Sequence, residues 1–389
     1  MGSKAFKPTL KNSEAISAFL NHPEKVLKLV HVAGSNGKGS TCSMLASILT
    51  EAGFKVGLFT SPHIKDYTER IRINGERIPQ SHVIDFVDRI KAGQFEFNPS
   101  FFEITFGLAL DYFKNKNCDI CIIETGLGGK FDATNIIDPI LSVITNVSLE
   151  HTAMLGDTIE KIASEKAGII KPKTPVVLGK MKFEAEKVMI SVAQEHNSMF
   201  IKSTDYDSLT EKYKLPLLGA YQKENLSTVI ATLAQLDRIN FKTKNESIQK
   251  GLDNITKNTG FAGRIQVVNL EPRIIQDVSH NPDGIEATLN TVINSTIGTL
   301  HIVFGTSADK DIYSSLSLFP LASNMYFTEF SNERSAKIED FKTLTESFDY
   351  SSKKYFSEPN KALKAAKDCA STNDTILIIG SFFLISDFL

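Results

Sequence analysis

Residues 30–49 read VHVAGSNGKGSTCSMLASIL, and this stretch decides the fold. An apolar run typical of a buried strand leads into a loop with three glycines, and a helical pattern follows. Glycine lets the backbone turn sharply and direct its N–H groups at phosphate oxygens, while the start of the helix adds a positive dipole end. Lys38 supplies a mobile cation for the β- and γ-phosphates. We therefore predict a nucleotide-binding loop made of Ser35, Asn36, Gly37, Lys38, Gly39 and Ser40.

The spacing of this loop differs from the common P-loop pattern. Its first glycine, Gly34, lies four residues before Lys38 instead of six, and Gly39 separates Lys38 from Ser40. A plain glycine-rich turn is the alternative, but it does not explain a lysine between two glycines. The order of strand, loop and helix favours nucleotide binding.

Short apolar runs alternate with longer helical patterns around this loop. The strands expected first are 26–32, 55–59, 119–124, 140–146 and 175–178. The helices expected between them include 40–52, 101–114 and 158–167. This alternation predicts parallel β–α–β units, and hence an α/β fold with a mostly parallel sheet covered by helices.

A second series of strands is expected at 265–269, 273–277, 300–304, 325–328 and 375–380. The length of 389 residues is more than one core usually holds, which also favours two domains. The segment KNTGFAGR, residues 257–264, has two glycines and no clear periodicity. We predict a P-loop domain at 1–257 that binds ATP, a linker at 258–264, and a smaller Rossmann-like α/β domain at 265–389.

The composition argues against several classes of protein. A net charge of -2 gives no electrostatic reason to expect a nucleic-acid or membrane partner. Four cysteines do not make a disulfide scaffold in a chain this long, and the CxxC of Cys118 and Cys121 lacks a second pair for zinc and sits in an expected buried strand. The start lacks the apolar segment of a signal peptide, and the longest apolar runs are too short to cross a bilayer. We expect a soluble monomer in the cytoplasm.

Three polar residues follow expected strands, where open α/β sheets bind their ligands. The Ser61 hydroxyl can join a Mg²⁺ shell, although a turn serine before proline is the alternative. Glu124 ends an apolar strand, where a carboxylate needs a partner such as a cation, or serves as a cap. A lone His151 is more often structural, but together these three residues predict a metal site beside the loop. Lys166, from its helical pattern alone, is expected to be solvated.

Several motifs occur in order along nearly the whole chain. They are HVAGSNGKGST, TSPHIKDYTERIRING, FFEITF, ETGLGGKFDATNI, LEHTAMLGDTIEKIASEKAGIIK, GRIQ, DVSHNP, the DKD at 309–311, and GSFF. Together they resemble the family of folylpolyglutamate synthases and dihydrofolate synthases, which belongs with the muramyl peptide ligases. The resemblance implies an ATP-dependent ligase that converts a carboxylate of dihydropteroate or a folate into an acyl phosphate, which the amino group of L-glutamate then attacks. It also implies two Mg²⁺ ions, with room for a monovalent cation.

The resemblance assigns roles to residues of the first domain. It implies that residues 35–40 cradle the triphosphate, that Ser61 and Glu124 hold one Mg²⁺, and that His151 helps to hold a second. Lys166 looks like the lysine that relatives carry as a carbamate formed with CO₂. On this reading the catalytic residues are Lys38, Glu124, His151 and Lys166.

Further roles concern the ligands. Gln222 and Asn225 resemble a nucleotide-contacting segment. Phe102 and Glu103 match positions that line the pterin pocket in relatives; for the neighbouring Phe101 the alternative is core packing at a helix start. In the second domain, Arg264 and Asp277 resemble residues that reach ATP. His280 resembles a residue that lies near the incoming amino acid.

Three alternatives remain. The first is a muramyl-type ligase, but such enzymes usually have a whole domain before the loop, and only 33 residues precede Gly34. Within these 33 residues, residues 6–20 (FKPTLKNSEAISAFL) are expected to be a reduced form of the pterin-contacting segment of relatives. A P-loop NTPase without ligase chemistry leaves SEKAGI and DVSHNP unexplained, and the presence of Lys38, Glu124 and His151 disfavours a non-catalytic relative. Whether the first glutamate is added, existing folates are extended, or both, is not readable; we expect both.

Overall fold

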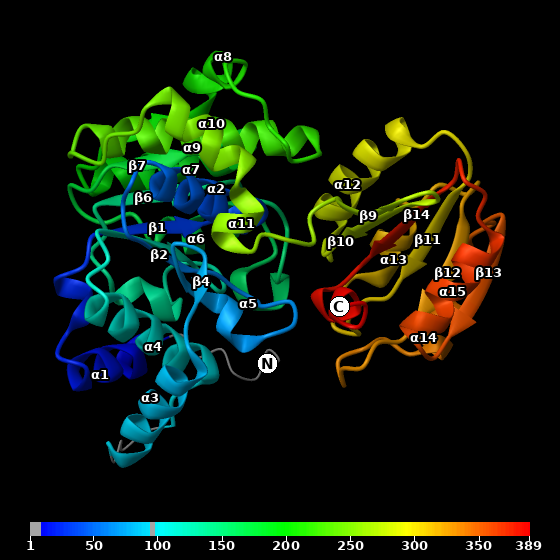
Figure 1. Ribbon diagram of the computed structural model, residues 1–389, viewed down its shortest axis with the longest axis horizontal. Coiled ribbons are helices and arrows are strands. Elements are labelled where there is room, and N and C mark those ends of the chain that lie inside the picture. Colours follow the sequence, from blue (N-terminus) through cyan, green and yellow to red (C-terminus); the bar gives the residue numbers. More distant parts are fainter. Residues whose placement is uncertain (1–8, 94–97) are drawn as a thin grey trace. The chain divides into compact units, whose positions relative to one another are not determined.

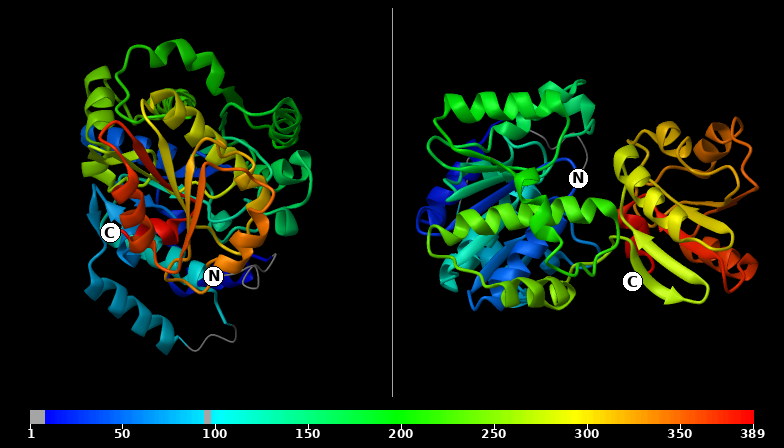
Figure 2. Two further views of the ribbon diagram at one scale, coloured as in Figure 1. Left: turned by 90° about the vertical axis from the view of Figure 1, so that its right-hand side faces the viewer. Right: turned by 90° about the horizontal axis from the view of Figure 1, so that it is seen from above.

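A computed structural model describes residues 9–93 and 98–389, and they divide into two compact units. The first unit contains the residues up to Pro216 together with Tyr221–Phe261. The second contains Leu217–Ala220 and Ala262–Leu389, and the latter segment is drawn from yellow-green to red in Figures 1 and 2. Residues 6–8 of the segment expected to contact the pterin lie outside the described residues.

The first unit is built on an eight-stranded sheet with the order β4-β3-β2-β5-β1-β6-β7-β8. Six strands run parallel: β1 (Leu29–Ala33), β2 (Val56–Phe59), β5 (Ile120–Glu124), β6 (Leu141–Ile144), β7 (Val176–Leu178) and β8 (Phe200–Lys202). The prediction of a mostly parallel sheet is confirmed. The short antiparallel strands β3 (Ile71–Ile73) and β4 (Glu76–Arg77) were not predicted, although Asn74-Gly75 between them is a typical hairpin turn.

Helices cover both faces of this sheet, as Figure 1 shows, and the central strands are therefore buried on both sides. One group includes α2 (Lys38–Glu51), α9 (Ala220–Asp237), α10 (Asn245–Asp253) and α11 (Ile255–Thr259). The opposite group includes α1 (Lys11–Phe19), α3 (Gln80–Ala92), α4 (Phe101–Asn115) and α7 (Phe183–Glu195); α4 packs near Leu29 and α7 near Ala33, which share one face of β1. The remaining helices of this unit are α5 (Thr152–Leu155), α6 (Ile159–Ala167) and α8 (Asp207–Thr210), with short 3₁₀ turns η2 (Pro23–Lys25), η3 (Tyr67–Arg70), η4 (Ala133–Ile136) and η5 (Ser203–Tyr206).

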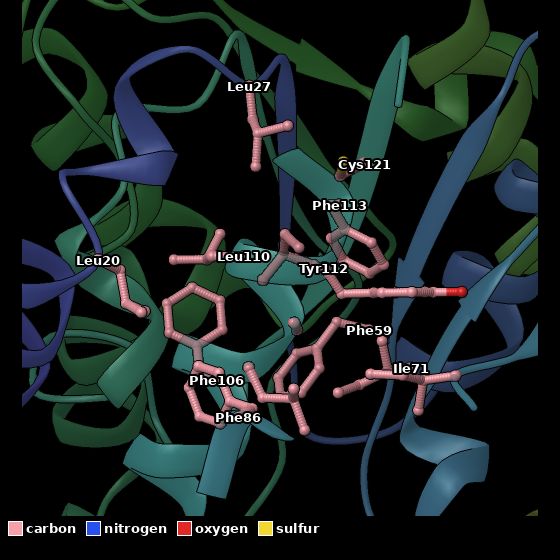
Figure 3. Close-up of a cluster of buried hydrophobic side chains, with 14 of the residues drawn as sticks. Leu20, Leu27, Phe59, Ile71, Phe86, Phe106, Leu110, Tyr112, Phe113 and Cys121 are labelled. Carbon is pink, nitrogen blue, oxygen red and sulfur yellow. The ribbon is translucent and has the colours of Figure 1, made fainter. Parts of the chain in front are cut away.

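A large aromatic core holds α4 against the sheet. Phe106 and Phe113 of α4 pack in one cluster with Phe59 of β2 and Phe86 of α3, all of them fully buried or nearly so (Figure 3). The Phe59 and Phe106 rings lie 5.5 Å apart and are tilted. Because each large buried aromatic side chain removes a large apolar area from water, this cluster fixes the end of β2 and the start of α4 relative to each other.

The second unit has a six-stranded sheet with the order β13-β12-β11-β14-β10-β9. Its strands are β9 (Gln266–Leu270), β10 (Arg273–Asp277), β11 (Leu300–Phe304), β12 (Asn324–Thr328), β13 (Ser352–Phe356) and β14 (Thr375–Ile379). All pair in parallel except β9, which is antiparallel to β10. Its helices are α12 (Pro282–Ser295), α13 (Ile312–Leu316), α14 (Ile338–Leu344), α15 (Pro359–Cys369) and α16 (Phe382–Ser386). This confirms the predicted Rossmann-like α/β class; β13 was not predicted, because SKKYF is a half-exposed edge strand with two lysines.

Cys42, Cys118, Cys121 and Cys369 are free thiols; Cys121 is buried in β5, as expected, whereas Cys118 precedes β5 and is only partly buried. Among the helices of the described residues, none has both the length and the apolar character that crossing a bilayer requires.

Candidate active site

The phosphate loop connects β1 to α2 and admits only glycine at two positions. A Cβ on Gly34 would lie 1.9 Å from Thr145 Oγ1, and a Cβ on Gly37 would lie 2.3 Å from Asn225 Oδ1. Gly37 also has φ +81°, which side chains rarely adopt. The loop backbone is thus packed tightly against residues that follow β6 and against α9.

Residues after β6 hold the first half of the loop. The Ser35 and Asn36 N–H groups donate to the backbone and side-chain oxygens of Asn146 at 3.0 and 2.8 Å. The Ser35 hydroxyl donates to the Ser148 carbonyl and accepts from the Ser148 N–H at 2.9 Å. The N–H groups of the first turn of α2 have no acceptor within the helix, so they form the part of the loop that can face an anion.

Lys38 lies folded over this loop. Its Nζ donates to the Gly34 carbonyl at 2.7 Å and to the Ser35 carbonyl at 3.1 Å. Neutral carbonyls are weaker partners for an ammonium group than phosphate oxygens are. Its position therefore allows Lys38 to exchange these two acceptors for the oxygens of a bound triphosphate.

Glu124 and Ser61 meet beside the loop. The carboxylate of Glu124, only 4% exposed at the end of β5, accepts a hydrogen bond from the Ser61 N–H at 3.0 Å. A Cβ on Gly39 would lie 3.8 Å from Glu124 Oε1. The ends of β2 and β5 and the start of α2 thus place a buried carboxylate within reach of the phosphate position.

The oxygen ligands at this position fit Mg²⁺. Magnesium prefers oxygen and is usually bound by one or two carboxylates, several waters and substrate phosphates. Among the residues that the structure describes, no group of three His, Cys, Asp or Glu side chains is arranged to hold a metal. A divalent ion here would therefore depend on Glu124, Ser61 and nucleotide oxygens together.

Lys166 is not solvated, so that expectation is wrong. Its side chain is 1% exposed, and its Nζ lies 2.7 Å from Glu150 Oε1. The helix was predicted correctly, but its pattern did not show that Lys166 is buried, because neighbouring elements cover α6 in the core around Ile162 and Ala163. Burial alone would raise the pKa of Glu150, but the charges of Lys166 and Lys38 outweigh it and lower that pKa to about 2. Burial lowers the pKa of Lys166, and Glu150 opposes this change.

His151 directly follows Glu150 and starts α5. Its backbone is left-handed, with φ +47°, an uncommon conformation for a residue other than glycine. The turn places His151 beside the Glu150–Lys166 pair. A positive charge on His151 lowers the pKa of Glu150.

Gln222 and Asn225 reach the phosphate loop from α9. Asn225 Oδ1 packs against Gly37, and its Nδ2 donates to Gln222 Oε1 at 3.0 Å. Gln222 is fully buried, and its Nε2 has no hydrogen-bond partner among the described residues. A buried amide without an acceptor is costly, so this group is a good candidate to bind a polar ligand atom.

At the start of α4, Glu103 is held by hydrogen bonds to its neighbours. Its carboxylate takes part in a capping box with Ser100 and accepts from Asn12 Nδ2 at 3.2 Å. Phe102 packs on Phe59, with ring centroids 5.7 Å apart, and a Cβ on Gly126 would lie 2.6 Å from its ring. Core packing is wrong for Phe101, because its side chain is 39% exposed.

A buried network behind β5 was not predicted. Asp132 Oδ2 accepts from the N–H groups of Gly126 and Leu127 at 2.9 and 2.8 Å, and its Oδ1 accepts from the Thr134 N–H at 3.0 Å. The Thr134 hydroxyl lies 2.8 Å from Nε2 of His31, in β1. Burial, with a smaller effect of Lys171, lowers the pKa of His31 to about 3, so this histidine is neutral. The network ties the strand before the phosphate loop to the loop after Glu124.

A second unpredicted group lies beside Ser61. Arg70 Nε donates to His63 Nδ1 at 2.8 Å, and the guanidinium lies over the ring of Phe101 at 5.4 Å. Tyr67 packs edge-on against the same ring. His63, Tyr67 and Arg70 are in the quoted motif at 60–75, and Phe101 begins the motif FFEITF, but nothing in the spacing alone assigns them a role.

In the second unit, the three predicted residues come together at the end of β10. Asp277 is fully buried and accepts from the N–H groups of Ile265 and Ser279, each at 2.8 Å. The Arg264 guanidinium carbon lies 5.1 Å from the centre of the Phe382 ring. The His280 ring packs on the same phenyl ring, with centroids 5.8 Å apart.

Comparison with known proteins places this arrangement in a class. Residues 32–233 match the Mur ligase middle domain, and residues 263–382 match the glutamate ligase domain of Mur ligases. The fold and the phosphate loop are thus those of the Mur ligases, which makes the chain an ATP-dependent ligase.

Relatives narrow this class. The dihydrofolate synthase/folylpolyglutamate synthase of Bacillus subtilis is 33% identical, over 98% of this chain and 94% of the relative. The Escherichia coli enzyme of the same name is 34% identical, over 91% of this chain and 84% of the relative. The structure of E. coli FolC in complex with DHPP and ADP matches with a TM-score of 0.87 and 31% identity, over 100% of this chain and 94% of that one. The chain belongs to the dihydrofolate synthase/folylpolyglutamate synthase family.

A further solved structure is that of the Yersinia pestis bifunctional enzyme complexed with AMPPNP and a Mn ion. It matches with a TM-score of 0.84 and 28% identity, over 100% of this chain and 94% of that one. The predicted family, ligase activity and fold are confirmed.

Proposed function

We propose that this enzyme joins L-glutamate to a carboxylate of dihydropteroate or of a folate, at the expense of ATP and through an acyl phosphate. The relatives of B. subtilis and E. coli carry both activities in their names. The observation that best supports the proposal is the buried Glu124 carboxylate beside Gly39 of the phosphate loop. We propose both activities for this chain.

The nucleotide site of the proposal consists of residues 35–40 with Gln222 and Asn225. Lys38 would leave the carbonyls of Gly34 and Ser35 and neutralise charge on the phosphates. The unpaired Nε2 of Gln222 supports a polar contact with the nucleotide.

The metal part of the proposal draws on Ser61, Glu124 and His151. A bound Mg²⁺ would polarise the γ-phosphate and neutralise the charge that develops on the leaving ADP. The Y. pestis relative crystallised with Mn and AMPPNP, which supports one divalent ion near the phosphates. A second Mg²⁺ near His151 and a monovalent cation are predictions of the resemblance.

Carbamate formation on Lys166 is part of the proposal. A neutral amine must attack CO₂ and then lose a proton, and the pKa of Lys166, lowered by burial, favours the neutral form. The product would be an anion beside Glu150, which now lies 2.7 Å from Nζ. Carbamate and ion pair are therefore alternative states, and the carbamate requires a cation between the two groups.

The remaining residues are proposed to bind the three substrates. Phe102 and Glu103 are proposed for the pterin, Arg264 and Asp277 for ATP, and His280 for glutamate. We also keep residues 1–257 as the ATP and acceptor domain and 265–389 as the glutamate-ligase domain. The cytoplasmic location and the monomeric state stay predictions.

One assay tests the activity. Purified enzyme receives ATP, Mg²⁺ and labelled glutamate, with dihydropteroate or tetrahydrofolate as acceptor, and product and phosphate are measured. We expect phosphate release that depends on both the acceptor and glutamate. Equal ATP hydrolysis without either substrate would instead favour an NTPase, and ligation to a UDP-sugar acceptor would favour a muramyl-type ligase.

A further inference from the structure

Arg70 is a half-buried cation without an acidic partner. The structure gives it no ion pair within residues 9–93 and 98–389, and the hydrogen bond of its side chain goes from Nε to the His63 ring. Burial lowers the pKa of Arg70, although a guanidinium keeps its charge in proteins. Arginine placed in this way is often found where a planar anion is bound.

The position of Arg70 relates it directly to the proposed reaction centre. The backbone carbonyl of Arg70 accepts from the Thr60 N–H at 3.0 Å. Ser61, which follows Thr60, donates its N–H to the Glu124 carboxylate. The negative charge of Glu124 acts on the guanidinium. The backbone of Arg70 is therefore hydrogen-bonded to the residue that precedes Ser61, and Ser61 contacts the carboxylate proposed to hold the metal.

Two contacts fix the plane of the guanidinium. His63 Nδ1 accepts from Nε at 2.8 Å, and the ring of Phe101 lies 5.4 Å away. With Nε engaged, the two terminal nitrogens remain for a ligand in the geometry that binds a carboxylate in bidentate fashion.

We propose that Arg70 binds the carboxylate of the acceptor, the folate or dihydropteroate group that is to be phosphorylated, and that His63 positions Arg70 for this contact. The inference rests on the proposed function. One carboxylate oxygen attacks the γ-phosphorus while the bond from that phosphorus to the β-bridging oxygen breaks and ADP leaves with the electron pair. Arg70 holds the acceptor during this transfer, beside Phe101.

A purely structural role is the main alternative. Arg70 would then only balance the charge of Glu124, and its loss would weaken metal binding or the fold instead of acceptor binding. Binding of the γ-phosphate is another possible role, and its loss would raise the KM for ATP. The KM values for acceptor, ATP and Mg²⁺ therefore separate the three roles.

The test compares Arg70→Ala and Arg70→Lys with the control Arg77→Ala. Arg77 ends β4 of the hairpin that directly follows Arg70, but its side chain is 49% exposed and lies 3.8 Å from Glu69. Because charge-assisted hydrogen bonds of this kind are strong, we expect Arg70→Ala to raise the acceptor KM by about 10- to 100-fold, with the ATP and Mg²⁺ dependence within about twofold. The lysine variant should recover little, since it lacks the planar fork. An acceptor KM within about twofold of wild type in Arg70→Ala would overturn the proposal, as would a main effect on ATP or Mg²⁺.

Positional isotope exchange in ATP labelled at the β,γ-bridge follows the first step alone, without glutamate. We expect the acceptor concentration needed for half-maximal exchange to rise in Arg70→Ala as the acceptor KM does. Exchange unchanged from wild type would show that Arg70 acts after the acyl phosphate forms, and would also overturn the proposal.

His63 tests the positioning role. Asparagine can present an oxygen near the place of Nδ1, whereas leucine cannot. We expect His63→Leu to raise the acceptor KM by about tenfold and His63→Asn to restore most of it, with kcat changed less than KM. Equal KM values in the two variants would refute the role of His63. If wild-type enzyme shows no acceptor-dependent turnover, the proposed function itself fails; normal wild-type turnover with active Arg70 variants refutes only this inference.

Discussion

Replacing Glu150 with glutamine removes the negative charge of the buried Glu150–Lys166 pair and leaves the shape of the side chain almost unchanged. The pKa of Glu150 is about 2 in the folded chain, against an ordinary value of 4.5. This difference of about 2.5 pH units, at about 1.36 kcal/mol for each unit, gives roughly 3 kcal/mol for the carboxylate alone at pH 7, and the lowered pKa of Lys166 acts in the opposite direction. The value agrees with the cost of breaking a buried ion pair, about 3–5 kcal/mol.

The pH dependence has a defined sign. Because the folded pKa of Glu150 lies below the unfolded one, the contribution is fully present above pH 4.5 and is lost as the pH falls toward 2. By integration, less than half of it remains at about pH 3. The difference in unfolding free energy between wild type and Glu150→Gln should therefore narrow over this range.

Urea unfolding followed by far-UV circular dichroism at pH 7, 5, 4 and 3, in bicarbonate-free buffer, measures this difference. Asp157→Asn is the matched control, because Asp157 lies in the same segment and pairs with Lys161 at 2.7 Å, but in full exposure to solvent. We expect the control to unfold as wild type does. A loss below about 0.5 kcal/mol in Glu150→Gln at pH 7, the range of neutral surface changes, would refute the argument from the buried pair.

Four further predictions concern the phosphate loop and the network behind it. Lys38→Ala should abolish ligation with an unchanged circular dichroism spectrum; wild-type turnover would contradict the phosphate role. Glu124→Gln should raise the Mg²⁺ concentration for half-maximal turnover by about tenfold or more, and an unchanged Mg²⁺ dependence would exclude it as a ligand. Gly37→Ala should weaken ATP binding by about tenfold in calorimetry, because a Cβ there meets Asn225 at 2.3 Å and φ +81° costs about 1–2 kcal/mol; equal affinity would disprove this packing argument. Thr134→Val should lower the unfolding free energy by about 1–2 kcal/mol while Thr134→Ser should not, and equal losses would show that the hydroxyl is unimportant.

Patterns within a single element were readable in the sequence. The strands β1, β2, β5 and β6 are short apolar runs with polar residues at their ends, and parallel order follows from the helices between them. The hairpin β3–β4 was missed in spite of its Asn-Gly turn, because two short polar strands carry little periodicity. The edge strand β13 was missed for a similar reason.

Burial and pairing of charged side chains were not readable. Lys166 has the sequence context of a solvated helical lysine, yet it is enclosed and paired with Glu150 from another loop. Arg70 and Asp132 are ordinary charged residues in the sequence, and only their neighbours distinguish them. Glu103 was assigned to a ligand on the resemblance, whereas its contacts in the structure are those of a helix cap.

The sequence by itself determined the phosphate loop, the α/β class and the family, because these depend on glycine positions, hydrophobic periods and ordered motifs that are local in the chain. The tertiary structure alone decided which groups meet: Asn225 with Gly37, Glu124 with Ser61, Lys166 with Glu150, and Arg70 with His63. The physical reason is that charge, burial and hydrogen bonding at these positions are set by residues distant in the chain, which periodicity does not encode.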